Sequence, residues 1–296
     1  MSWLGQRTSS YAERMTRPTT PDGGTPRSSP TSASLILTGE RTLPGIPDER
    51  YWFARHVVAY LAAADRVGRL PGAVVLDAGC GEGYGLELLA QAGASRVVGV
   101  DLDPQVVAHA TARYATPDPG CTRADGTGPH IEVAQAELSS LPLADEEVDL
   151  TVSFQVIEHL HDIPGYLASL RRVTAPDGAV LIATPNRLTF TPDSEVPVNP
   201  FHTREFTAAE LTDELARAGF VVDAILGVHH GGSLAAAEAE LGAPLPELLG
   251  ATAPEHWDAE LRELVHATEP DGFTLRGDDL DASLDLLAVC RIAAVP

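Results

Sequence analysis

Cysteine and positive charge are both scarce in this chain of 296 residues. The three cysteines (Cys80, Cys121 and Cys290) lie far apart and form no Cys-x-x-Cys pair, which argues against a disulfide framework or a zinc site and suits a reducing compartment. Lys and Arg total 20 against 42 for Asp and Glu, giving a formal net charge of −22. A field of that sign repels a phosphate backbone, so we expect no nucleic-acid partner.

Long hydrophobic runs are missing as well. No apolar stretch has the length that a membrane span needs, and the N-terminus lacks the apolar centre of a signal peptide. Residues 1–33 are instead rich in Ser, Thr, Pro, Gly and Arg, as in TTPDGGTPRSSPTS, and bury too little apolar surface to offset the entropy lost on ordering. We therefore expect a disordered tail at residues 1–33 and a cytoplasmic location.

From Val74 onward the chain shows a regular alternation of strand and helix signals. Helical patterns separate most of the strand candidates, and the helix after Thr207 begins with a Thr-x-x-Glu capping box. Short apolar runs predict seven strands, near residues 74–79, 96–103, 130–138, 148–157, 179–185, 220–228 and 283–293. This alternation predicts an α/β fold, with a mainly parallel sheet covered by helices on both faces.

A helix is also predicted ahead of the first strand. Asp48 stands where its N-cap would be, and Trp52, His56 and Tyr60 share one face at helical spacing. The segment from Tyr51 to His56 either packs the helix on the sheet or lines the mouth of a site.

The domain organisation follows from the spacing of the last two strands. Residues 229–280 lie between them, which is far more than a hairpin requires, and contain short helical runs. We therefore expect one α/β domain at residues 34–228, a helical cap at residues 229–280, and the last strand of the domain in residues 281–296.

The sharpest motif is a glycine-rich turn, Asp77-Ala-Gly-Cys-Gly-Glu-Gly83, directly after an apolar strand and before a helix. Glycines at such a place let the backbone turn tightly and approach a ligand. Tyr84 stands where a dinucleotide-binding fingerprint has its third glycine, which argues against NAD or FAD. Asp101 ends the next strand, where a carboxylate can accept both hydroxyl protons of a ribose; alternatively, it caps the helix that begins near Pro104.

Four segments between Val74 and Pro185 resemble class I methyltransferases that use S-adenosylmethionine (SAM): VLDAGCGEGYG, VVGVDLDP, AELSSLPL and FQVIEHL, in that order. The resemblance implies a Rossmann-like seven-stranded sheet, whose last strand runs antiparallel in the edge region. It also implies SAM as the methyl donor and S-adenosylhomocysteine as a product.

The same resemblance implies which residues bind SAM. Asp77 and the backbone of Gly79, Gly81 and Gly83 would hold its amino-acid end, and Asp101 would hold the ribose.

Four more residues are placed around the adenine and the methyl group by the resemblance. Leu102 would pack on the adenine, and Glu137 stands where the family usually has Asp, in contact with the adenine amino group. Leu138 belongs to the same segment. Gln155 ends the fourth strand, beside the expected methyl position.

A narrower resemblance involves TGERTLPGIPDERYWFARH, FQVIEHLHD, TPNRLTFTP, VNPFHTREF and DASLDLLAV. These segments look like actinobacterial, including mycobacterial, methyltransferases that are associated with polymethylated polysaccharides of the methylglucose lipopolysaccharide type. The resemblance implies O-methylation of a sugar hydroxyl, with a small-molecule or oligosaccharide acceptor. Two alternatives remain open: a quinone-like or other lipid acceptor, and a SAM-binding protein without activity. The oligomeric state is open too.

Candidate catalytic groups follow the fourth strand, at the edge of a parallel sheet where ligands bind. Glu158 and His159 come first, and His159 is the leading candidate for a general base because a neutral imidazole can take a hydroxyl proton. Alternatively, both residues only orient a loop. His202 lies in the Pro-rich segment 187–205, which either closes over the acceptor or forms a packed surface loop.

A metal is not required by this interpretation. His159, His161 and Asp162 could gather a divalent cation such as Mg²⁺, but His-x-His with acidic neighbours is a weak pattern. The pair His229-His230 is equally ambiguous.

Overall fold

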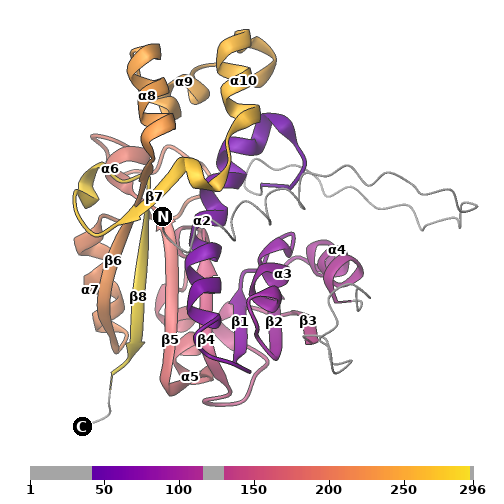
Figure 1. The fold of residues 1–296 in the computed structure, drawn as a ribbon. Coiled ribbons are helices and arrows are strands. Elements are labelled where there is room, and N and C mark those ends of the chain that lie inside the picture. Colours follow the sequence, from indigo (N-terminus) through magenta and orange to yellow (C-terminus); the bar gives the residue numbers. More distant parts are fainter. Residues whose placement is uncertain (1–41, 116–129, 294–296) are drawn as a thin grey trace, which may run out of the picture.

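A computed structural model describes residues 42–115 and 130–293, so the expected tail at residues 1–33 lies outside the described residues, as does Cys121. The described chain forms one twisted sheet with helices on both faces, and three cap helices stand beyond one end of the strands (Figure 1). None of the described helices is both long and apolar enough to cross a membrane.

The sheet has the strand order β3-β2-β1-β4-β5-β8-β6-β7. Strands β1 to β5 are parallel, and β8 runs antiparallel to both of its neighbours, β5 and β6. The strands span β1 Val74–Ala78, β2 Arg96–Asp101, β3 His130–Gln135, β4 Val148–Phe154, β5 Thr174–Pro185, β6 Phe220–His230, β7 Phe273–Arg276 and β8 Asp285–Ile292. The predicted α/β fold and its mainly parallel sheet are therefore confirmed.

The strand count and the content of the cap differ from the prediction. The short strand β7 lies within the segment that we expected to be helical, and it pairs antiparallel with Gly227–His230 of β6. This pairing makes β7 the edge strand and the sheet eight-stranded. The last strand, β8, runs antiparallel as expected, and it lies between β5 and β6. Phe273 buries its ring at the start of β7, which accounts for the attachment.

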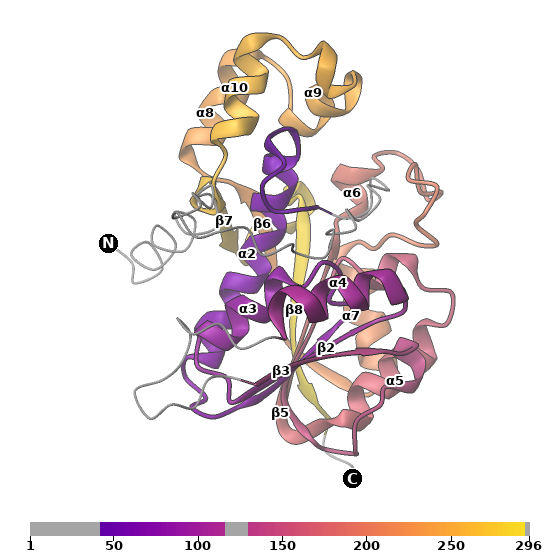
Figure 2. The same ribbon diagram turned by 90° about the vertical axis from the view of Figure 1, so that its right-hand side faces the viewer.

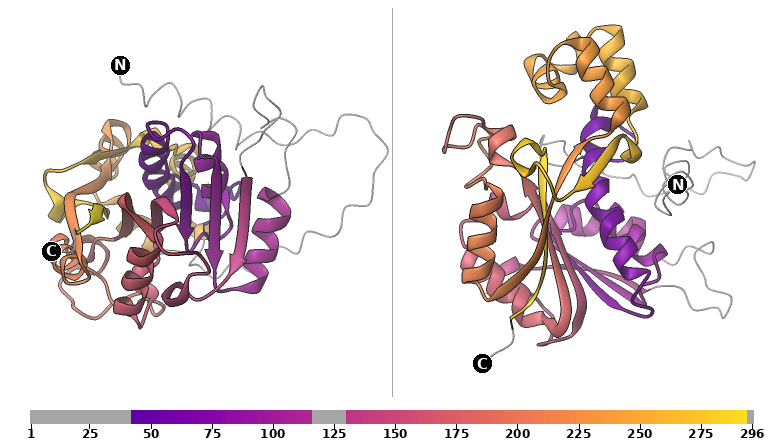
Figure 3. Two further views of the ribbon diagram at one scale, coloured as in Figure 1. Left: turned by 90° about the horizontal axis from the view of Figure 1, so that it is seen from below. Right: turned by 60° about the vertical axis from the view of Figure 1, so that its left-hand side comes forward.

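Helices cover the two faces of the sheet unequally, as both views of Figure 3 show. On one face, α2, α3 and α4 bury one hydrophobic cluster, and on the other face α5 and α7 bury a second. The α-helices span α2 Arg50–Val67, α3 Tyr84–Gln91, α4 Pro104–Tyr114, α5 Ile163–Val173, α6 Arg187–Phe190, α7 Ala208–Arg217, α8 Gly232–Leu241, α9 Leu245–Ala251 and α10 Ala259–Ala267.

Short 3₁₀ turns occupy several connections. They span η1 Pro47–Glu49, η2 Leu138–Ser140, η3 Ile157–His159, η4 Pro254–His256, η5 Pro270–Gly272 and η6 Leu280–Ala282. Two residues separate the end of β4 from the turn η3, which carries the candidate catalytic residues Glu158 and His159 away from the sheet.

Side-chain caps fix several helix starts, and they decide one open question. Thr207 begins α7 with the predicted capping box, and Asp162 caps α5. Asp103, not Asp101, caps α4 by accepting from the N–H of Gln105. The cap predicted for Asp48 is wrong, because Pro47 starts the turn η1 first and the N-cap of α2 is Glu49, which makes no side-chain cap.

The cap helices pack on the first half of α2 (Figure 2). Tyr51 is buried against Phe273, and Trp52 stacks on Trp257 with ring centroids 6.1 Å apart. These contacts favour packing, against β7 and the cap, for Tyr51 and Trp52 over a role at the mouth of a site.

Candidate active site

The glycine-rich turn joins β1 to α3 and is shaped by close contacts. Gly79 has a φ of +86°, and a Cβ built on it would lie 2.4 Å from a methyl carbon of Val156. Gly81 also has a positive φ, but a Cβ there would meet nothing within 4 Å. Gly83 is the N-cap of α3. The backbone of the turn therefore packs tightly at Gly79 and faces open space at Gly81.

Asp77, at the end of β1, is fully buried beneath this turn. The hydroxyl of Tyr60 donates to its Oδ2 at 3.0 Å, while Oδ1 has no hydrogen-bond partner. Burial raises the pKa of Asp77 to about 7, although the Tyr60 hydrogen bond acts in the opposite direction. A buried carboxylate oxygen without a partner suits a cationic group of a ligand.

Asp101 connects the turn to the end of β2. Its Oδ2 accepts from the backbone N–H of Gly81 at 3.1 Å, and its Oδ1 accepts from the N–H of Asp103 at 2.9 Å. A carboxylate has about four lone-pair sites, so this one can still accept from ligand hydroxyls. The side chain of Leu102, next in the chain, is 61% exposed. Glu137 is exposed after β3 and Leu138 half-buried.

Gln155 follows the last residue of β4 and has a left-handed conformation with a φ of +55°. Its backbone N–H donates to the carbonyl of Ala183 at 2.8 Å, and its side-chain Nε2 donates to Oδ1 of Asp285 at 3.3 Å. Asp285 forms a buried two-point ion pair with Arg55, with both N–O distances 2.5 Å. The pair thus anchors the side chain of Gln155 from α2 and β8.

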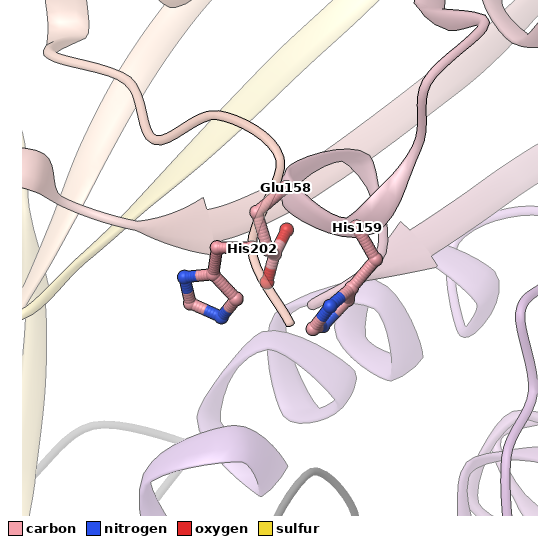
Figure 4. A group of neighbouring side chains, drawn as sticks. All are labelled: Glu158, His159 and His202. Carbon is pink, nitrogen blue, oxygen red and sulfur yellow. The ribbon is translucent and has the colours of Figure 1, made fainter. Parts of the chain in front are cut away.

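Figure 4 shows Glu158, His159 and His202 gathered in one cluster, with the carboxylate between the two rings. One ligating atom from each side chain lies within 4.8 Å of the others. Glu158 and His159 belong to η3, and Thr203 ties the segment that carries His202 to this turn by donating its N–H to the carbonyl of Glu158 at 2.7 Å.

Hydrogen bonds fix each member of the cluster. Glu158 is 1% exposed and its Oε2 accepts from the Thr184 hydroxyl at 2.9 Å. Burial raises the pKa of Glu158 to about 8. The Nδ1 of His202 lies 2.7 Å from Oε1 of Glu205, and the Nδ1 of His159 lies 3.1 Å from the carbonyl oxygen of Phe201. Glu158 can therefore gain or lose a proton near neutral pH.

Other histidine candidates lie elsewhere. His161 is exposed, and the Oδ1 of Asp162 accepts from the N–H of Gly165 as a helix cap. His229 lies near Arg276, and His230 contacts the hydroxyl of Tyr51. Among the described residues, the group that could gather a metal is Glu158, His159 and His202, and not the set that the sequence suggested.

Residues 76–182 match the family described as a methyltransferase domain. A probable SAM-dependent methyltransferase of Mycolicibacterium smegmatis is 45% identical over 262 residues, which cover 87% of this chain and 95% of that protein. This chain belongs to the SAM-dependent methyltransferases. Another probable member, from Mycobacterium tuberculosis, is 42% identical over 275 residues, covering 90% of this chain and 94% of that protein.

The fold of this methyltransferase is also found among solved structures. The protein solved in complex with the Trm112 methyltransferase activator of Haloferax volcanii superposes with a TM-score of 0.55 at 18% identity, covering 84% of this chain and 95% of that one. The expected class I fold and the expected methyl donor, SAM, are thus confirmed.

Sequence inspection of the methyltransferase missed the residues that support its cluster and Gln155. Thr184 and Glu205 hold Glu158 and His202, and Arg55 with Asp285 anchors Gln155. Glu205 follows His202 by three positions, but in an irregular segment the sequence spacing of two residues does not predict whether their side chains are in contact. Arg55 and Asp285 are 230 positions apart, and no local pattern connects them.

Proposed function

We propose that this methyltransferase transfers the methyl group of SAM to a sugar hydroxyl of a polysaccharide or glycolipid precursor. The observation that carries the proposal is the Glu158–His159–His202 cluster at the carboxyl edge of the sheet. A hydroxyl loses its proton during methyl transfer, so proton-accepting groups assist this reaction. The resemblance to actinobacterial methyltransferases of polymethylated polysaccharides points to the same class of acceptor.

The glycine-rich turn is proposed to hold the amino-acid end of SAM. Asp77 supports this because one of its buried oxygens lacks a partner, and the ligand's ammonium group would supply one. Gly79 and Gly83 shape the turn, and the open space at Gly81 lets a carboxylate approach the backbone N–H groups.

The remaining cofactor contacts lie along the ends of β2, β3 and β4. Asp101 would accept the ribose hydroxyls, and the exposed Leu102 would pack on the adenine. Glu137 and Leu138 would border the adenine from the end of β3. Gln155 would lie beside the methyl group, oriented by Asp285.

The acceptor chemistry needs alignment and the loss of one proton. SAM supplies a methyl group on a positively charged sulfur, which is already activated toward an in-line attack. The protein therefore has to position the hydroxyl and exclude competing water. His159 is proposed to assist the loss of the hydroxyl proton, and the segment that carries His202 to close over the acceptor.

The experiment is a transfer assay with methyl-labelled SAM. The acceptors are short glucosides and mannosides, with a quinol as the alternative, each with and without added divalent cations. We expect label on the glucosides or mannosides. Label on the quinol alone would overturn the sugar assignment, and SAM binding without transfer to any acceptor would favour a protein that binds SAM without activity.

A further inference from the structure

We propose that Glu158, His159 and His202 bind one divalent transition-metal ion. The existence of this site rests on the geometry of the three side chains, and only its role in catalysis rests on the proposed sugar methylation. The ligand set is one carboxylate and two imidazoles, brought together from a turn and a distant segment. Three protein ligands with open positions left for water or substrate are typical of catalytic metal sites.

The hydrogen bonds of the two imidazoles give the strongest support for a metal site. A histidine that binds a metal usually donates its other ring N–H to a carboxylate or a backbone carbonyl. His202 has Nδ1 against the Glu205 carboxylate, and His159 has Nδ1 against the Phe201 carbonyl. Both bonds leave Nε2 as the nitrogen that carries a lone pair. The two rings therefore have the supporting contacts of metal ligands.

The Nε2 atom of His202 already receives a donor in this structure. The side-chain Nδ2 of Asn199 lies 3.0 Å from it, which confirms that this nitrogen accepts. An N–H group there occupies the direction in which an ion would bind. Binding therefore requires the side chain of Asn199 to move away. It also requires the three ligand atoms, which now lie within 4.8 Å of one another, to approach to about 3.3 Å, the separation between ligands that tetrahedral zinc geometry implies.

Two buried carboxyl groups provide a second reason for a cation, because an ion would compensate their charged forms. Glu158 and Glu205 are 1% and 3% exposed, and the second oxygen of Glu205 is buried without a hydrogen-bond partner. Glu158 accepts from the Thr184 hydroxyl and Glu205 contacts the His202 ring, and neither of these groups is a permanent cation. Because buried carboxylates are costly without compensation, an ion between the rings would stabilise this arrangement.

The ligand types select among ions. Imidazoles suit zinc and other first-row transition metals, whereas Mg²⁺ prefers oxygen ligands and retains its water. In the sequence, the lack of a Cys-x-x-Cys pair argued against a zinc site. That pair would supply thiolate ligands, so its absence does not bear on a site of histidine and glutamate. We therefore assign the site to an ion such as Zn²⁺, Mn²⁺ or Co²⁺.

The ion would bind the acceptor hydroxyl and lower its pKa. The hydroxyl proton passes to solvent, the oxygen forms the new bond to the methyl carbon, and the carbon–sulfur bond breaks with its electron pair left on sulfur. In this form of the reaction His159 assists proton loss through the ion rather than by taking the proton itself.

The test is Co²⁺ binding to the full chain after treatment with a chelator, followed by visible absorption and by calorimetry. We expect one ion per chain, at least a tenfold loss of affinity in Glu158→Gln and His202→Gln, and a loss of about 10–100-fold in Glu205→Gln, which removes only a supporting contact. His161→Gln is the matched control, an exposed histidine of the same loop, and should bind Co²⁺ as the original chain does.

Two results would overturn the site. One is the absence of a one-to-one Co²⁺ signal at millimolar concentration, and the other is equal affinity in His202→Gln, Glu205→Gln and His161→Gln. The two proposals also fail separately. Undiminished sugar methylation by a chain that binds no Co²⁺ leaves the proposed function standing and overturns the metal site. One bound ion per chain with no methylated sugar supports the site and contradicts the sugar acceptor.

Discussion

The backbone N–H of Gly81 donates a hydrogen bond of 3.1 Å to the carboxylate of Asp101. This bond joins the glycine-rich turn after β1 to the end of β2, so the parts of the molecule that are proposed to hold the amino-acid end and the ribose of SAM are fixed to each other. Because Asp103 caps helix α4, Asp101 is not needed for that purpose. Its role can therefore be tested apart from helix stability.

We expect Asp101→Ala to weaken SAM binding by about 1.5–3 kcal/mol, because the ribose hydroxyls lose a charged hydrogen-bond partner. Asp103→Ala is the matched control. It should cost about 1 kcal/mol of folding stability through the lost cap and leave SAM affinity nearly unchanged. Calorimetric titration of both variants with SAM measures the contrast. Equal loss of affinity in the two variants would mean that Asp101 does not contact the cofactor.

The shape of the glycine-rich turn can be tested by folding stability. Gly79→Ala forces a side chain into a left-handed position, and its Cβ would lie 2.4 Å from Val156. Gly72→Ala has a similar φ of +82° but meets nothing within 4 Å. We expect Gly79→Ala to be less stable than Gly72→Ala by about 1–3 kcal/mol, the usual cost of overpacking. Urea unfolding compares them, and equal stabilities would show that the turn relaxes freely.

SAM affinity should depend on pH through Asp77, whose pKa is raised to about 7 by burial. The ligand's ammonium group prefers the ionised carboxylate, so affinity should rise about tenfold per pH unit up to pH 7 and then level off. The contribution of Asp77 to the folding stability of the protein without ligand changes in the opposite direction, because it falls as the pH rises. Because the folded state holds this proton more tightly than the unfolded state, the contribution of Asp77 falls from about pH 4 to about pH 7.

The measurement is the dissociation constant of SAM across this pH range, for the original chain and for Asp77→Asn. The variant cannot ionise at this position, so its binding should lose the steep dependence below pH 7. A variant with the same pH profile as the original chain would assign the titration to another group.

His159→Ala should lose about 10²–10⁴-fold in turnover and keep its affinity for SAM, because the proposed role of this residue is to assist proton loss and not to bind the cofactor. His161→Ala, two positions further and exposed, should remain close to the original activity. Single-turnover rates with a glucoside separate the chemical step from binding. Normal turnover in His159→Ala would contradict this role and would mean that alignment of the acceptor hydroxyl with the methyl group is enough for the reaction.

Local sequence patterns predicted most of the fold because the elements are strongly periodic or continuously apolar. The parallel strands β1 and β4 are buried on both faces and appear as apolar runs. Strand β7 has only four residues and a single buried one, so it carries no such signal. Its place in the sheet comes from pairing with β6 and from the burial of Phe273, both of which depend on the folded chain.

The candidate site was predictable in part for the same reason. Glu158 and His159 lie within five residues of the end of β4, and ligands bind at this edge of a parallel sheet. Their contact with His202 depends on an irregular segment, which Thr203 holds against Glu158 by a backbone hydrogen bond. No periodic sequence pattern describes that segment. Asp162 was grouped with these residues by proximity in sequence, but its carboxylate faces the start of α5 instead.

Thermal unfolding in the presence of S-adenosylhomocysteine tests most directly whether the glycine-rich turn with Asp77 and Asp101 is a SAM site. At a hundred times its dissociation constant, a ligand of the folded state adds about 2.7 kcal/mol of stability. For a domain of this size, we expect Tm to rise by roughly 5–10 °C. NADH should leave Tm unchanged, and Asp101→Ala should reduce the shift at equal ligand concentration. A shift with NADH and none with millimolar S-adenosylhomocysteine or SAM would contradict the account.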